Sequence, residues 1–172
     1  NTAGIPDQKK GVLILDLNIN EKYFKRAIHH EIFHIIYDSF EYLFDQTIWS
    51  GYNEKNFKYA ECSTCSDQKG LDLYNNTKGF LTEYSKSTAS EDMAEVYSFL
   101  ITDKLNIQNK ITKDPILFSK VDFNEYKVWV LSFPKTSLEC FCDVWFDFYG
   151  SLNSPLKRKK SHFCAIFDDF GP

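Results

Sequence analysis

Two histidines and a glutamate in the first quarter of the chain form a pattern that can bind a metal ion. His30-Glu31-Ile32-Phe33-His34 reads H-E-x-x-H. On a helix, residues four apart lie one above the other, so both imidazoles can reach one zinc ion at about 2.0–2.1 Å. Glu31 follows the first histidine directly and can act as the general base for a metal-bound water. The pattern predicts two zinc ligands and a base.

A catalytic zinc site needs a third protein ligand and keeps one position open. Glu91 and Glu95 lie four apart on a second predicted helix. One carboxylate can bind the metal while the other accepts a hydrogen bond from a ligating histidine, which fixes the tautomer of that ring. An acidic, solvated first helical turn, favoured by the helix dipole, accounts for the same spacing equally well.

Three further polar residues near these motifs are weaker candidates. His29 points about 100° away from His30 around the helix, so we expect it to pack or to support the site. His162 stands alone in the C-terminal segment, where a structural role is favoured over a ligand role. Asp38 shares the helix face of His34 and is expected to be a solvated acid.

Hydrophobic periodicity and capping residues predict the elements that position these side chains. The H-E-x-x-H motif falls in the middle of an amphipathic helix capped by Asn18 or Asn20. In chain order we predict a strand over 11–17, a helix over 21–44, an irregular segment over 45–76, an extended segment over 79–85, and helices over about 88–104, 114–134 and 138–149.

Composition indicates one folded domain, and the predicted strand and helices indicate an α+β fold that is mostly helical with a small sheet. The chain has 172 residues, of which 43% are hydrophobic, and a net charge of −4. That charge argues against nucleic acid as a partner, and no apolar run is long enough to span a membrane. We expect a single domain over 1–172, with its core motifs in 11–104 and a C-terminal helical part over 114–172.

The chain has five cysteines, an odd number, so at least one of them has no disulfide partner within the chain. Disulfides, a second metal site and reduced buried thiols all remain open readings. A second zinc held by the C-x-x-C and C-x-C pairs is the less favoured of these. For localisation, we favour a secreted protein. The cysteines are Cys62, Cys65, Cys140, Cys142 and Cys164.

With the downstream E-x-x-x-E, the H-E-x-x-H motif resembles the gluzincin metallopeptidases. The closer likeness is to the catalytic domains of anthrax lethal factor and the Pro-Pro endopeptidases, in which a tyrosine lies seven residues before the ligand glutamate, as Tyr84 does here. The resemblance covers about 100 residues, roughly 11–104. It implies these roles: His30, His34 and Glu91 as zinc ligands, Glu31 as base, Tyr84 as oxyanion stabiliser and Glu95 as support for a ligating histidine.

The resemblance implies a zincin-like fold in which the edge strand, here 11–17, lines the cleft and pairs with substrate. It also implies a zinc-dependent endopeptidase with one catalytic Zn²⁺, which hydrolyses protein or peptide substrates by a Glu-activated zinc-bound water. Two departures stand out: the loop carrying the C-x-x-C looks like an insertion, and the segment after Asp114 matches no family pattern. The alternatives are an inactive zincin-fold binding module, which usually lacks the base that Glu31 supplies here, and a structural zinc protein built on the cysteines.

Overall fold

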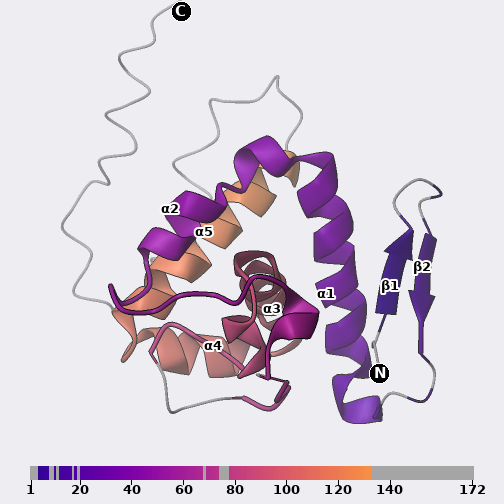
Figure 1. Cartoon of the computed structure of the whole chain (residues 1–172), viewed down its shortest axis with the longest axis horizontal. Helices are drawn as coiled ribbons and strands as arrows, with labels where there is room; N and C mark the ends of the chain where they lie inside the picture. The colour runs from indigo at the N-terminus through magenta and orange to yellow at the C-terminus, as the bar shows by residue number, and fades with distance from the viewer. Residues whose placement is uncertain are drawn as a thin grey trace, which may run out of the picture. The chain divides into compact units, whose positions relative to one another are not determined.

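The computed structural model describes residues 4–7, 10, 12–16, 18, 20–67, 69–73 and 78–132. Within these residues helices predominate (Figure 1), which confirms the mostly helical prediction. None of the described helices is long and apolar enough to cross a membrane. The elements are β1 (Gly4–Asp7), β2 (Val12–Leu15), α1 (Glu21–Ser39), α2 (Gln46–Gly51), α3 (Ala89–Thr102), α4 (Lys104–Ile111) and α5 (Pro115–Ser132), with short 3₁₀ turns η1 (Glu41–Leu43), η2 (Ser63–Cys65) and η3 (Tyr84–Lys86).

Helix α1 carries the H-E-x-x-H motif. The side chain of Asn20 caps it by accepting a hydrogen bond from the Lys22 amide at 3.0 Å. The helix ends at Ser39, earlier than the predicted 44, because the chain leaves helical geometry at Phe40, where φ is −136°. The turn that follows lets Phe44 bury its ring against Phe33, with the centroids 5.2 Å apart.

Helix α3 is the central element of the described core. Eight of its fourteen residues are buried, so it is enclosed on most sides, and it packs along α1. Thr88 caps it by accepting from the Glu91 amide at 3.2 Å. The helix predicted over about 88–104 is confirmed to within two residues, since α3 ends at Thr102; a separate helix, α4, then begins at Lys104.

Strands β1 and β2 form a two-stranded antiparallel sheet in which Ile5 pairs with Ile14. The predicted 11–17 strand corresponds to β2, whereas β1 was not predicted. In Figure 1, β1 lies between α1 and β2. The strand nearest the motif helix is therefore β1. The role expected for the 11–17 strand, as the edge that lines the cleft, stays a prediction.

Two segments predicted to lack helices differ in the structure. The 45–76 segment contains α2, which begins because the Asp45 carboxylate accepts from the amides of Thr47 and Ile48 at 2.7 and 3.1 Å. The 79–85 segment is not extended: Gly79 has a φ of +85°, and turn η3 follows.

Helix α5 begins where the sequence predicted, because the Asp114 carboxylate accepts from the amides of Ile116 and Leu117. The predicted 138–149 helix, His162 and the three C-terminal cysteines lie outside the described residues. Backbone contacts divide the chain into units 1–130 and 131–172. Only Leu131 and Ser132 of the second unit are described, so the single-domain expectation stays a prediction.

Candidate metal centre

Three predicted ligand side chains converge at the interface between α1 and α3. His30 Nε2 lies 2.8 Å from Glu91 Oε2 and 3.2 Å from His34 Nε2, and His34 Nε2 lies 3.3 Å from Glu91 Oε2. Among the described residues this is the one group of three or more potential ligands whose donor atoms all lie within 4.8 Å of one another. Two imidazole nitrogens and one carboxylate oxygen, aimed at a common point, are the ligand set that zinc takes in catalytic sites. The residues present therefore fit a zinc ion.

Local structure accounts for this convergence. His30 and His34 are one helical turn apart, so they share a face of α1. Glu91 lies in the first turn of α3, where the Thr88 cap fixes its backbone amide. Ser90 Oγ lies 3.3 Å from His34 Nδ1, so the far side of that ring also has a polar neighbour.

Glu95 is the carboxylate that supports His30. Its Oε1 lies 2.9 Å from His30 Nδ1, and its Oε2 accepts a hydrogen bond from Thr82 Oγ1 at 2.8 Å. Arg26 Nε approaches the same oxygen at 4.0 Å. With Nδ1 donating to Glu95, the other ring nitrogen, Nε2, points toward His34 Nε2 and Glu91 Oε2, and these three atoms are called the cluster below.

Carboxylates on two sides change the acidity of His30. Burial alone would lower the pKa of this imidazole, but hydrogen bonds and charges from Glu91 and Glu95 outweigh burial and raise it to about 10. Burial alone would raise the pKa of Glu91, but hydrogen bonds and positive charge from His30 and His34 outweigh burial and hold it well below its ordinary value. In the metal-free protein His30 is thus a cation between two carboxylates, and a metal ion would take the place of its Nε2 proton.

Glu31 is buried, with 8% of its surface exposed. Burial raises the pKa of its carboxyl, and the charge of Glu91 acts in the same direction. Positive charge on His30 and His34 opposes this rise. A buried carboxylate next to the histidine pair, with its proton affinity increased, can accept a proton from a neighbouring donor.

Tyr84, from turn η3, lies beside the cluster. The centroid of its ring is 5.9 Å from that of His30. Burial, followed by the negative charge of Glu91, raises the pKa of this phenol well above its ordinary value. At neutral pH Tyr84 therefore keeps its proton and can donate a hydrogen bond.

A buried ion pair between α3 and α5 was not found from the sequence. Lys120 Nζ lies 2.6 Å from Asp92 Oδ2, both side chains are fully buried, and the lysine also donates to Gly79 O at 2.7 Å. The same aspartate oxygen accepts from Trp49 Nε1 at 2.8 Å and Tyr59 OH at 2.6 Å. The available signal was that Lys120 shares the buried face of α5 with apolar residues, a position that lysine occupies only when paired.

The remaining sequence candidates lie apart from the cluster. His29 is half-buried and Asp38 is exposed. Cys62 and Cys65 form a disulfide with each other, so in this state neither offers a thiolate to a metal. The other two members of the predicted cysteine site, Cys140 and Cys142, lie outside the described residues.

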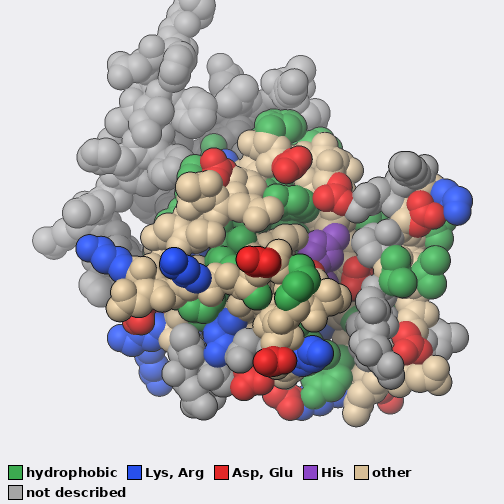
Figure 2. Space-filling model, viewed as in Figure 1, with side chains coloured by type: hydrophobic (Ala, Val, Ile, Leu, Met, Phe, Trp, Pro, Cys, Tyr) green, Lys and Arg blue, Asp and Glu red, His purple; other side chains and the backbone are tan. Residues whose placement is uncertain are grey.

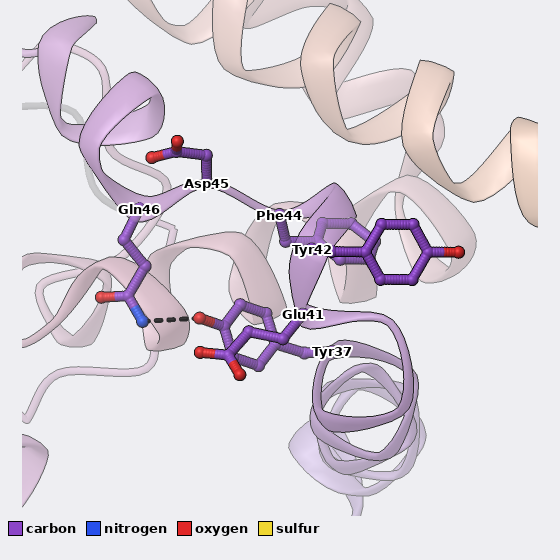
Figure 3. Close-up of a pocket in the computed structure, with 6 residues that line it drawn as sticks. All are labelled: Tyr37, Glu41, Tyr42, Phe44, Asp45 and Gln46. Atoms are coloured by element: carbon purple, nitrogen blue, oxygen red, sulfur yellow. Dashed lines mark hydrogen bonds between the residues drawn. The ribbon is translucent and has the colours of Figure 1, made fainter.

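Two views show the surroundings of the centre. A histidine side chain is visible at the surface between the helical body and the hairpin (Figure 2). A cavity of about 320 Å³ lies beyond the end of α1. In it Gln46 Nε2 donates to the hydroxyl of Tyr37 at 2.7 Å, with Glu41 nearby (Figure 3). Because Tyr37 follows His34 by three residues, this cavity begins about one helical turn from the cluster.

Two histidines four apart, a glutamate next to the first, and a carboxylate from a second helix are the residue types that a zinc metallopeptidase site requires. Comparison with protein-family models gives the same class: residues 8–130 match the family described as "Putative zinc-binding metallo-peptidase". The match covers more than half of the chain, and the chain belongs to this family. No curated protein and no solved structure matches it.

Proposed function

We propose that this chain is a zinc-dependent endopeptidase of the gluzincin type, with His30, His34 and Glu91 as the zinc ligands. The observation that carries the proposal is the convergence of His30 Nε2, His34 Nε2 and Glu91 Oε2 within 4.8 Å. The family match supports the coarser class, since its description names zinc and peptidase activity. The position of Tyr84 beside His30 and Glu91 supports the closer likeness to lethal factor and the Pro-Pro endopeptidases.

Bound zinc would supply Lewis acidity, which brings the pKa of a coordinated water to about 7 and polarises the scissile carbonyl. Glu31 is the residue that accepts the proton of the attacking water. Its raised proton affinity suits both halves of the cycle, because the same carboxyl must later deliver that proton to the leaving amine.

Two further residues assist without reacting. Tyr84 keeps its proton and donates a hydrogen bond to the oxyanion that forms at the attacked carbonyl, a contact worth about 3–4 kcal/mol in comparable sites. Glu95 accepts from His30 Nδ1 and so holds this ring with its Nε2 directed at the cluster.

The competing functions are a zincin-fold binding module without turnover and a structural zinc protein built on cysteines. Glu31 argues against the first, because such a module has no need for a buried carboxylate of raised proton affinity beside the histidine pair. The Cys62–Cys65 disulfide argues against the second, because it occupies two of the four thiolates that such a site requires.

The test measures zinc per chain by elemental analysis and hydrolysis of a mixed peptide library. We expect about one zinc in the wild type, loss of zinc in Glu91→Ala, and retained zinc in Glu31→Gln with hydrolysis reduced at least about 100-fold. Glu54→Ala, at an exposed position away from the cluster, is the matched control. Zinc that survives Glu91→Ala would exclude the ligand assignment, and a zinc-loaded wild type that cleaves no library peptide would favour the binding module.

A further inference from the structure

The cavity beyond the end of α1 is formed by the connection between α1 and α2. Its volume of about 320 Å³ lies at the lower end of the range of roughly 300–1,000 Å³ that ligand pockets span. One continuous stretch of chain lines it, from the last turn of α1 through η1 to the first residue of α2 (Figure 3). We call this cavity the acidic pocket, and its lining residues are Tyr37, Glu41, Tyr42, Phe44, Asp45 and Gln46.

Aromatic rings provide much of the lining of the acidic pocket. Tyr37 and Phe44 are buried, and their ring centroids lie 6.0 Å apart. Tyr42 is 81% exposed, so its ring remains available to a ligand. The hydroxyl of Tyr37 accepts a hydrogen bond from Gln46 Nε2 at 2.7 Å, and in the described part of the chain no acceptor takes its proton. The pocket therefore combines aromatic surface with a buried hydroxyl that can donate to a carbonyl oxygen.

The charge of the acidic pocket is negative. Glu41 and Asp45 contribute carboxylates, and none of the lining residues is basic. Oδ1 of Asp45 accepts from two amides at the start of α2, which hold the pKa of this carboxyl below its ordinary value. The charge of Lys127 in α5 lowers this pKa less than the amides do, and its Nζ lies over the rings of Phe123 and Tyr126. Within the described residues, no ion pair neutralises the pocket.

The end of α1 favours a cation at the same place. The last carbonyl groups of a helix carry a partial negative charge that stabilises nearby cations, and the last turn of α1 contains no basic residue. Aromatic rings attract a cation to their faces, and the apolar stem of a long basic side chain can pack against them. Carboxylates, helix end and rings together match a lysine or arginine side chain, whereas an apolar ligand would desolvate the carboxylates without compensation.

The acidic pocket begins on the histidine-bearing face of α1. Tyr37 follows His30 by seven residues and His34 by three, so the three side chains share one face of the helix. The pocket begins about one helical turn, roughly 5.4 Å, beyond the cluster. An extended peptide advances about 3.3–3.6 Å per residue, so a substrate held at the metal centre can reach the pocket with a side chain two or three residues from the cleaved bond.

We propose that the acidic pocket is a specificity subsite that binds a lysine or arginine side chain of the peptide substrate. This inference rests on the proposed function, because the metal centre is where that peptide would be hydrolysed. Glu41 receives the cation, Asp45 adds a second negative charge, and the rings of Tyr37 and Tyr42 contact the stem. The proposal gives the substrate class that the metal centre by itself does not define: peptides with a basic residue two or three positions from the cleaved bond.

The kinetic test compares peptides that differ at a single position, which carries lysine, arginine or norleucine. Norleucine has the apolar stem of lysine without its charge. We expect kcat/KM of the wild type to be about tenfold higher for the basic peptides, because each of two exposed ion pairs contributes about threefold. The preference should appear at one constant distance from the cleaved bond. Equal kcat/KM for the lysine and norleucine peptides at every position would overturn the proposal.

Two variants assign the preference to the pocket. Glu41→Gln should lower the ratio of kcat/KM for lysine and norleucine peptides about threefold, and Glu41→Gln/Asp45→Asn should bring it close to one. Asparagine caps helices about as well as aspartate, so α2 should still form. Glu54→Gln, at an exposed position outside the pocket, is the matched control and should leave the ratio unchanged. A ratio retained in the double variant would exclude the pocket as the source of specificity.

A binding measurement separates the pocket from the proposed function. In the protein as purified, Nα-acetyl-lysine-N-methylamide should shift the NMR signals of the Gln46 side-chain amide with a dissociation constant on the order of 10 mM, and the norleucine analogue should not. The side-chain amide of Asn106, which donates to the carboxylate of Asp103, controls for attraction of the cation to any exposed acid. Equal shifts of Gln46 by both compounds, or equal shifts of Gln46 and Asn106 by the lysine compound, would refute the subsite.

This measurement needs neither zinc nor hydrolysis, so the two proposals can fail separately. Selective binding of the lysine compound to a protein that cleaves no peptide would count against the proposed function and support the pocket. Hydrolysis without selective binding would support the proposed function and overturn the pocket.

Discussion

Replacing Glu95 tests whether the zinc affinity of the metal centre depends on this supporting carboxylate as well as on the ligands. Glu95→Gln keeps the size of the side chain and an oxygen that can accept from His30 Nδ1. It removes the negative charge that now lies 2.9 Å from that nitrogen. Thr82, which donates to the other carboxylate oxygen, can rotate its hydroxyl to accept from the new amide, so the geometry should survive.

The size of the effect follows from these contacts. A hydrogen bond to a charged group is worth about 1.5–3 kcal/mol and roughly twice its neutral counterpart, so the substitution removes about 1–1.5 kcal/mol. The substitution also lowers the pKa of His30, and this partly relieves competition between zinc and the proton. We therefore expect about a tenfold loss of zinc affinity for Glu95→Gln, and up to about 100-fold for Glu95→Ala, which leaves His30 Nδ1 without a partner.

The assay is competition with a chromophoric chelator at pH 7.5, which gives the zinc dissociation constant of each variant. Glu54→Gln, an exposed acid, controls for the change in net charge, and circular dichroism checks that the helices are retained. Equal zinc affinity in wild type and Glu95→Gln, with both folded, would refute the argument that the carboxylate orients His30.

Three further predictions concern the buried charges and the turn beside them. Lys120→Met should lower the free energy of unfolding of the metal-free protein in urea by about 3–5 kcal/mol, because it leaves Asp92 buried without a counter-charge. The double variant with Asp92→Asn should lose less stability than the sum of the two single variants, and an additive loss would contradict the pairing. Zinc affinity should fall about tenfold per pH unit from pH 9 to 6, because the pKa of His30 is raised to about 10 and zinc must displace its proton; a chelator titration that shows no pH dependence would exclude this linkage. Gly79→Ala should lower the melting temperature by the equivalent of about 1–3 kcal/mol, because φ is +85° and the new Cβ would lie 2.5 Å from Ile116 Cγ2; an unchanged melting temperature would show that the turn can relax.

The part of the site that the sequence predicts is the part set by local spacing. His30 and His34 share a face on any helix, and so do Glu91 and Glu95. The only part of the arrangement that local spacing does not predict is the packing of the two helices against each other. Family likeness singled out Tyr84 by its distance from Glu91 along the chain. These residues converge at the α1–α3 interface, although their roles remain proposals.

The residues that the sequence did not reveal depend on contacts between distant segments. Lys120 of α5 reaches Asp92 of α3 across 28 positions, and Trp49 of α2 reaches the same carboxylate across 43. Helix α2 and helix α4 were missed because short helices carry too few turns for a hydrophobic period to stand out. Strand β1 was missed for the same reason: it has four residues, one of them a proline.

The contacts that α3 makes with α1 and α5 suggest why its first turn can hold a metal ligand precisely. Glu91 and Glu95 face α1, whereas Asp92, next to Glu91 in sequence, points about 100° away from Glu91 around the helix and is held by Lys120 of α5. Each of these acids has a polar partner, so a rotation of α3 that moved Glu91 away from the histidines would also break the Asp92–Lys120 pair. An uncompensated buried charge costs several kcal/mol, more than most single contacts contribute. The buried pair therefore restricts the position of Glu91 before any metal arrives, and a preorganised ligand loses less free energy on binding than one that must first be ordered.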